Sequence, residues 1–271
     1  MRKTISTAAC SSKKQEKANN RISHTYMMQR YFVTLAFDGT AYHGWQIQPN
    51  GNSVQEELQR ALSTLLRQPI EIVGAGRTDA GVHASMMVAH FETDREDVDV
   101  QQLVYKLNRL LPRDISVSAV RPVAADMHAR FSATLRTYHY HIHLRKDPFR
   151  RHYSCEIHWP LDFDLMNEAA SHLLHVSDFG AFCKSHTDVK TTLCNVTEAR
   201  WMPDGEGAWY FRISANRFLR NMVRAVVGTL MEVGRHRITL DQFDAIVAGR
   251  QRTAAGESMP GHALFLERVE Y

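Results

Sequence analysis

The order of its hydrophobic patterns constrains the fold of this chain more than any single motif. Short runs rich in β-branched and aromatic residues alternate with helical spacing in the order β-α-β-β-α-β, and this order occurs twice along the 271 residues. Such an order is typical of a split βαβ unit. We therefore expect an α+β protein of two ferredoxin-like halves, residues 31–133 and 134–271. Their mixed, mainly antiparallel sheets would flank a central cleft that suits an extended ligand.

Helix starts and strand runs support this division. Ser53 and Asp99 stand where N-caps are expected in the first half, each followed by leucines at helical spacing. Asp164, Arg217 and Thr239 are the expected starts of three helices in the second half. Strands are expected over 31–37, 70–75, 84–92 and 115–120, and again over 136–144, 192–202, 208–215 and 264–271.

Charge is unevenly distributed along the chain. Of 33 basic and 29 acidic residues, residues 1–30 hold seven bases and one acid, which leaves 26 bases and 28 acids elsewhere. We expect a disordered basic tail over 1–30, and any nucleic acid would have to meet local basic patches. No apolar run reaches the roughly 18 residues of a membrane span. The four cysteines form no C-x-x-C pair, which favours a cytoplasmic protein without structural zinc or disulfides.

A glycine-rich loop between two expected strands is the strongest candidate for a reactive site. Residues 74–84 hold three glycines together with Arg77 and Asp79, and Asp79 is the only acid between Glu71 and Glu92. Glycines at such a turn let a ligand or another backbone come close. The aspartate could be a nucleophile or general base, or it could hydrogen-bond its own backbone in an ordinary turn. A phosphate-binding loop is disfavoured, because the glycine spacing is wrong and a strand follows instead of a helix.

Three arginines stand at helical spacing in the second half. Arg217, Arg220 and Arg224 would share one face of the helix expected over 217–233. Such a face is commonly a solvated basic surface. Arg224, however, lies among apolar residues, so we expect a partly buried guanidinium that needs a carboxylate partner, for which Asp79 is the candidate.

Three histidines alternate along the strand expected over 136–144. His139, His141 and His143 would share one face, where a metal site is conceivable. A polar strand face is favoured, because no nearby aspartate, glutamate or cysteine supplies further ligands in the sequence, and we expect no bound metal. Tyr138, on the other face, could stack on a nucleic-acid base or belong to the core.

Several sequence blocks together resemble one known family over about residues 31–271. The most specific block is Gly76-Arg77-Thr78-Asp79-Ala80-Gly81-Val82-His83, and the others include Phe37-Asp38-Gly39-Thr40, Gly44-Trp45-Gln46, Leu111-Pro112-Arg113-Asp114-Ile115, Arg136-Thr137-Tyr138-His139-Tyr140, Asn216-Arg217-Phe218 and Met222-Val223-Arg224. On these blocks the sequence is similar to the tRNA pseudouridine synthase A family, bacterial enzymes that isomerise uridine to pseudouridine in the anticodon stem-loop of tRNA. The resemblance implies the pseudouridine synthase fold, with an RNA-binding cleft between the halves.

The resemblance also implies roles for individual residues. Asp79 would be the catalytic aspartate, Arg224 its charged partner, and Tyr138 the ring that stacks on the target uracil. Arg77 matches a residue that helps to hold the target base flipped out. The residues that we expect to bind substrate beside Tyr138 are Arg77, Leu264, Arg217 and Arg220.

The family implies a homodimer in which one tRNA spans both subunits, with uridines at tRNA positions 38, 39 and 40 as targets. It implies no metal and no organic cofactor, which agrees with an isomerisation that gains and loses no atom. One block departs from the family pattern Ala-Pro-x-x-Gly-Leu, since Met259 and Ala263 replace its alanine and glycine. This departure affects the expected base pocket and leaves room for a pseudouridine synthase with a different RNA target. The other alternative is a non-catalytic RNA-binding module of the same fold.

Overall fold

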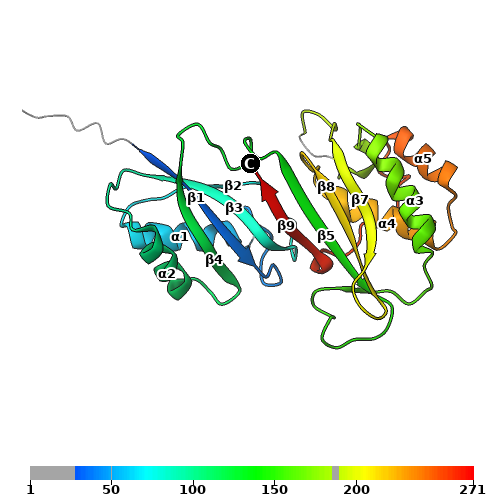
Figure 1. Cartoon of the computed structure of the whole chain (residues 1–271), viewed down its shortest axis with the longest axis horizontal. Helices are drawn as coiled ribbons and strands as arrows, with labels where there is room; N and C mark the ends of the chain where they lie inside the picture. The colour runs from blue at the N-terminus through cyan, green and yellow to red at the C-terminus, as the bar shows by residue number, and fades with distance from the viewer. Residues whose placement is uncertain (1–27, 50, 185–188) are drawn as a thin grey trace, which may run out of the picture.

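One continuous sheet runs through the computed structural model, in which residues 28–49, 51–184 and 189–271 are described (Figure 1). Its strands are β1 (Gln29–Phe37), β2 (Ile72–Gly74), β3 (His83–Thr93), β4 (Ile115–Val123), β5 (Leu135–His143), β6 (Cys155–Glu156), β7 (Val196–Pro203), β8 (Ala208–Ala215) and β9 (Leu264–Glu270). They lie in the order β4-β1-β3-β9-β5-β8-β7, with β2 paired to β3 and β6 to β5. Only the β3–β9 and β5–β6 pairings are parallel among the described strands, so the sheet is mixed but mainly antiparallel.

The expectation of two separate sheets is wrong, because β9 joins them. This strand pairs along its length with β5 and runs parallel to β3, where residues 265–266 face residues 83–84. Its apolar side chains contribute to both of the hydrophobic cores of the protein. Leu264 belongs to one core, and Leu266 and Val269 belong to the other. Pairing both edges of β9 satisfies backbone groups that two separate sheets would leave at open edges.

Two helices cover the N-terminal part of the sheet, at the left of Figure 1: α1 (Val54–Leu66) and α2 (Val100–Leu110). Both begin where the sequence predicts. The Ser53 hydroxyl and the Asp99 carboxylate each accept a hydrogen bond from a backbone N–H in the first turn. The caps therefore fix both helices, and their buried leucines belong to the same core as residues of β1 and β3.

Three helices lie on the C-terminal part: α3 (Phe163–His172), α4 (Met222–Gly234) and α5 (Leu240–Gly249). The predicted capping box of Thr239 is confirmed at α5. At α3 the predicted start at Asp164 is slightly late, because the Asp162 carboxylate accepts the capping hydrogen bond from the Leu165 N–H. Short 3₁₀ turns cover Leu173–His175, Gly180–Phe182 and Gly261–Ala263.

The start of α4 differs from the sequence prediction in a way that matters for the site. Asn221, with φ of 66°, lies in the left-handed region, and a residue there interrupts a right-handed helix. The helix therefore begins at Met222. Arg217 and Arg220 precede it, and only Arg224 stands on it, so the three arginines do not share one helix face.

The structure describes only the last residues of the expected N-terminal tail. Residues 1–27 of the expected tail lie outside the described residues, and β1 begins at Gln29, inside the tail's expected limit. Within the described ranges, no helix is long and apolar enough to cross a membrane. The two apolar cores lie on either side of β9. A division into domains 31–133 and 134–271 stays a prediction.

Candidate active site

Asp79 lies on the loop of residues 75–82, which connects β2 to β3. Other segments press against the backbone of this loop. Gly44 has φ of 95°, and a Cβ there would lie 2.2 Å from the Thr78 carbonyl oxygen. A Cβ on Gly261 would lie 2.7 Å from another carbonyl oxygen of the loop. Only glycine permits such close approaches, so these contacts fix the loop that carries the carboxylate.

Asp79 faces two arginines from the segment around the start of α4. Arg224 Nη1 donates a hydrogen bond of 3.1 Å to Asp79 Oδ2, and Arg220 Nε lies 3.9 Å from Oδ1. The Asp79 and Arg224 side chains are 26% and 21% exposed. The carboxylate is thus paired and yet open to solvent on one side, as a group that meets a substrate must be. We call Asp79, Tyr138, Arg220 and Arg224 the Asp79 region.

The segment before β9 positions Arg224. The Met259 carbonyl oxygen accepts from Arg224 Nε at 2.5 Å, and the Met259 N–H donates to the Arg224 carbonyl oxygen at 3.1 Å. Gly228 lets this segment lie against α4, since a Cβ there would stand 1.8 Å from the Glu257 carbonyl oxygen. The unusual residue type at Met259 leaves these contacts intact, because they use its backbone.

Tyr138 extends the Asp79 region onto β5. Its ring stands edge to face with that of Phe218, with centroids 5.0 Å apart. Burial raises the pKa of Tyr138 to about 12, and the Asp79 charge adds to the rise while Arg136 opposes it. The phenol is therefore neutral at physiological pH, and the contribution of Asp79 reflects the proximity of the two groups.

The other expected substrate-binding residues have different surroundings. Arg77 is exposed, and in the described part of the chain it makes no hydrogen bond or ion pair. Arg217 is half-buried, and no ion pair with Asp79 is formed among the described residues. Leu264 begins β9, is 5% exposed and packs in the core, so it offers little surface in this conformation. The structure thus brings Arg220 and Arg224 to Asp79, but it does not bring Leu264 to the surface.

Sequence reasoning missed Arg136. Its guanidinium donates to four carbonyl oxygens, those of Ala75, Arg130, Ala133 and Asn216. One side chain therefore ties the start of the Asp79 loop to the segment that leads toward Arg217. Burial lowers the pKa of Arg136, which reflects how far this cation is enclosed. Its position in the sequence could have identified Arg136, because residues two apart on a strand share a face and Tyr138 is an expected site residue.

His83, also missed, fastens the far end of the loop and is 1% exposed. Its Nδ1 accepts from the Gly39 N–H at 3.0 Å, and its Nε2 donates to the His262 carbonyl oxygen at 3.0 Å. Burial lowers the pKa of His83. The neutral ring suits both bonds, because only the neutral imidazole can accept at one nitrogen and donate at the other. Asp38 Oδ1 lies 3.0 Å from the same Nδ1, and its charge opposes the effect of burial on the pKa of His83.

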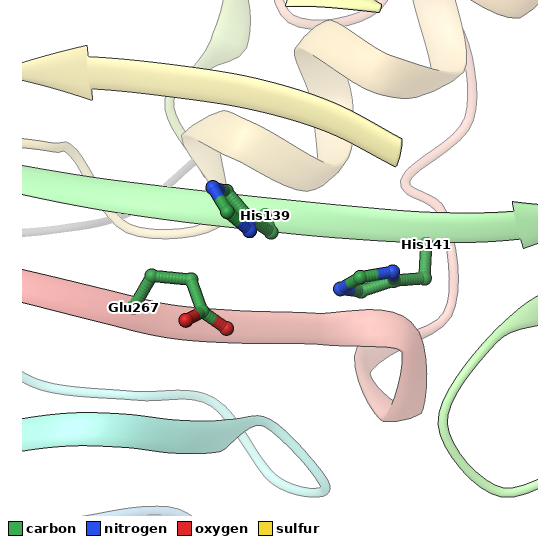
Figure 2. Close-up of side chains that lie close together, drawn as sticks. All are labelled: His139, His141 and Glu267. Atoms are coloured by element: carbon green, nitrogen blue, oxygen red, sulfur yellow. The ribbon is translucent and has the colours of Figure 1, made fainter. Parts of the chain in front are cut away.

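No acid lies near the alternating histidines in the sequence, but the fold brings one to them. His139 and His141 lie beside Glu267, which the neighbouring strand β9 contributes (Figure 2). His143 is separate, since it is buried and hydrogen-bonded to Ser154. We call His139, His141 and Glu267 the histidine cluster.

Comparisons with known proteins show which family the chain resembles over most of its length. A family model described as tRNA pseudouridine synthase matches residues 34–132 and 169–271. A tRNA pseudouridine synthase A of Bacteroides fragilis is 59% identical over 244 residues, which cover 90% of this chain and 97% of the relative. Relatives of the same name from Bacteroides thetaiotaomicron and Bacillus subtilis are 58% and 38% identical, over 90% and 89% of this chain and 91% and 99% of their own lengths.

Proposed function

The chain belongs to the tRNA pseudouridine synthase A family, and from this premise we propose that it isomerises uridine to pseudouridine at positions 38, 39 and 40 of the tRNA anticodon stem-loop. One observation carries the assignment of Asp79 as the catalytic carboxylate. It is a partly exposed acid, hydrogen-bonded to Arg224 at 3.1 Å, on a loop that glycine contacts hold in place. A module that only bound RNA would have no need of this acid, whose charge repels phosphate.

The reaction balances without a cofactor. The N1–C1′ bond of uridine breaks, the base turns, C5 bonds to C1′, and the proton that C5 releases is matched by one that N1 gains. The Asp79 carboxylate would attack C1′, attack the base or take the C2′ proton, and each route needs the ionised acid. Arg224 holds the carboxylate in place with a charge-assisted hydrogen bond of 3.1 Å.

The target base has to leave the helical stack before it reacts, at a cost of a few kcal/mol. Stacking on the Tyr138 ring would return roughly 1–3 kcal/mol, and Phe218 supports that ring from the side. Arg77 would hold the base flipped out, since its exposed guanidinium is available for an RNA contact. Arg217 and Arg220 would bind the phosphates that flank the base. Leu264 would reach the base only after a local rearrangement.

We further propose that the protein acts in the cytoplasm as a homodimer, with one tRNA across both subunits. The basis is the family resemblance together with the modest charge outside residues 1–30, which favours local contacts over a large basic surface. Light scattering of the protein alone and with a tRNA transcript measures both stoichiometries. A monomer that binds one tRNA with full activity would contradict this part of the proposal.

The function is tested by nucleoside analysis of an unmodified tRNA transcript that carries uridines at positions 38 to 40. The transcript is incubated with wild type, with Asp79→Asn and with Asp97→Asn, without cofactor. Asp97 is a matched control, because it too pairs with an arginine, at 3.0 Å from Arg95, but lies on the surface. We expect pseudouridine from wild type and Asp97→Asn, and a loss of roughly a thousandfold or more in Asp79→Asn.

Two other outcomes separate the alternatives. Pseudouridine from Asp79→Asn at the wild-type rate would overturn the role of Asp79. Tight tRNA binding by wild type without any pseudouridine would favour the binding module or another RNA target. Screening total RNA would then distinguish these two alternatives.

A further inference from the structure

The histidine cluster lies on the side of the sheet away from the Asp79 region. His139 and His141 are two residues apart on β5, so both point to the face opposite Tyr138. Glu267 comes from β9, and Figure 2 shows its carboxylate turned toward the two imidazole rings. One potential ligand atom from each of the three residues lies within 4.8 Å of the others. Two imidazoles and a carboxylate form a donor set that zinc and related transition metals prefer.

An irregularity in strand pairing brings the carboxylate to the histidines. Thr137 pairs with Arg268, whereas Tyr138 pairs with Leu266, so Glu267 is the extra residue of a bulge between them. A bulge redirects the side chain of its extra residue and often accompanies a functional site. In an uninterrupted ladder, Glu267 would instead have its own partner on β5.

Outer groups orient the cluster as they do around bound metals. His141 Nδ1 lies 3.6 Å from Asp204 Oδ2, and Arg150 holds that carboxylate at 2.8 Å. The Ser85 hydroxyl donates to Glu267 Oε1 at 2.9 Å. A carboxylate behind one ring nitrogen favours the tautomer whose other nitrogen is free to bind a metal, and a hydrogen bond orients the acid.

The charges of the three side chains also suit a metal. An imidazole binds a metal in its neutral form. The half-buried Glu267 offsets the positive charge of an ion.

We propose that His139, His141 and Glu267 bind one divalent transition-metal ion, with zinc as the best match to the donors. Bonds of about 2.0–2.2 Å bring ligand atoms roughly 3–4 Å apart, so the cluster has to close by about 1 Å. Rotation of the long Glu267 side chain is the simplest way to do so. Three protein ligands leave a coordination position for water. The ion would link β5 to β9 through its ligands, and β9 is the strand that joins the two parts of the sheet.

Metal binding by the full-length protein tests this proposal independently of catalysis. Metal-free wild type, His139→Ala and Glu267→Gln are titrated with Zn²⁺ by calorimetry and with Co²⁺ by visible absorption. We expect one strong site in wild type, with Co²⁺ bands typical of nitrogen and oxygen ligands, and a loss of affinity of more than tenfold in each variant. Asp204→Asn should weaken binding by roughly 10–100-fold, as other outer-group changes do.

Matched controls exclude trivial explanations. His158→Ala removes an exposed histidine that lies 3.8 Å from Glu156, outside the cluster, and it should leave the strong site unchanged. The melting temperature of each metal-free variant is measured first. If His139→Ala does not fold, Glu267→Gln still tests the site, because it keeps the size of the side chain. Zinc should raise the melting temperature of wild type more than that of either ligand variant. Equal affinity in wild type and Glu267→Gln, or equal loss in His158→Ala, would overturn the proposal.

Discussion

Tyr138 and His139 are consecutive residues of β5, yet they belong to regions that are built in different ways. In the Asp79 region, the acid stands on a loop that close backbone contacts at glycines hold in place. In the histidine cluster, every side chain comes from a strand, and the register of β5 against β9 sets their spacing. The position of the Asp79 side chain therefore depends on the segments that contact its loop. The spacing of the histidine cluster depends first on the register of the two strands.

The two regions share a strand but no side chain. They should therefore respond independently to substitution, as sites without shared partners usually do. The following predictions test that independence, and they test whether the loop is as dependent on its neighbours as the contacts indicate.

Among the substitutions that test this comparison, the largest effect is expected from Arg224→Ala, which leaves Asp79 without its hydrogen-bonded partner. Pseudouridine formation should fall roughly a hundredfold or more. The free energy of unfolding should fall by about 1–3 kcal/mol, less than for a fully buried pair because both groups are partly exposed. Zinc affinity of the histidine cluster should change by less than about twofold. Arg237→Ala, which loses a surface contact with Glu232, is the control. Loss of zinc binding in Arg224→Ala would break the comparison.

A pair of glycine substitutions tests how tightly the loop is held. Gly81→Ala should cost about 1–2 kcal/mol for its left-handed φ of 75°, because the nearest atom to a new Cβ lies 3.8 Å away. Gly44→Ala has a similar conformational cost and adds a clash with the Thr78 carbonyl, so we expect a further loss of about 1–3 kcal/mol. Urea denaturation of both variants measures the difference. Equal losses of unfolding free energy in the two variants would mean that the loop moves to accommodate the new Cβ at little cost.

Lowering the pH should reduce the free energy of unfolding through protonation of His83. Its folded pKa lies below the unfolded value of about 6.5. The unfolded chain therefore takes up a proton that the folded ring does not, and stability is lost as the pH falls below about 6.5. The contribution is at most about 1.4 kcal/mol per pH unit. In His83→Gln, whose amide can still accept and donate, unfolding between pH 7.5 and 5 should depend less on pH. Identical slopes would exclude His83 as the cause.

The smallest effect is expected from Phe218→Leu, which removes the ring that supports Tyr138 from the side. An aromatic pair of this kind contributes about 0.5–1.5 kcal/mol, so the free energy of unfolding should fall by about 1 kcal/mol, with a modest rise in KM for tRNA. Phe149→Leu is the control, because that ring is 90% exposed. A fall in kcat without a rise in KM would indicate that Phe218 affects the chemical step instead.

Local signals in the sequence predicted the parts that local interactions determine. The caps at Ser53, Asp99 and Thr239 and the helices that follow them are confirmed, because a cap depends on residues within one turn. The apolar neighbours of Arg224 indicated a buried cation that needs an acid, and the structure does bring it to Asp79. The catalytic roles of these residues stay predictions.

Local signals in the sequence did not predict which distant strands pair with each other. The parallel contact between β3 and β9 joins residues far apart in the chain, and no local pattern marks it. The left-handed conformation of Asn221, which delays α4, cannot be read from helical spacing. Glu267 reaches the histidines only because a bulge shifts the register. Each failure concerns a contact or a dihedral angle that the rest of the fold imposes.

The position of β9 has a consequence for the order in which the protein is made. This strand lies at the centre of the sheet, yet every other described strand precedes it in the chain. The segment that holds Arg224 and touches the Asp79 loop immediately precedes it. A nascent chain therefore cannot complete the contacts that hold Arg224 beside Asp79 until this segment has been translated, and the sheet stays divided until β9 follows.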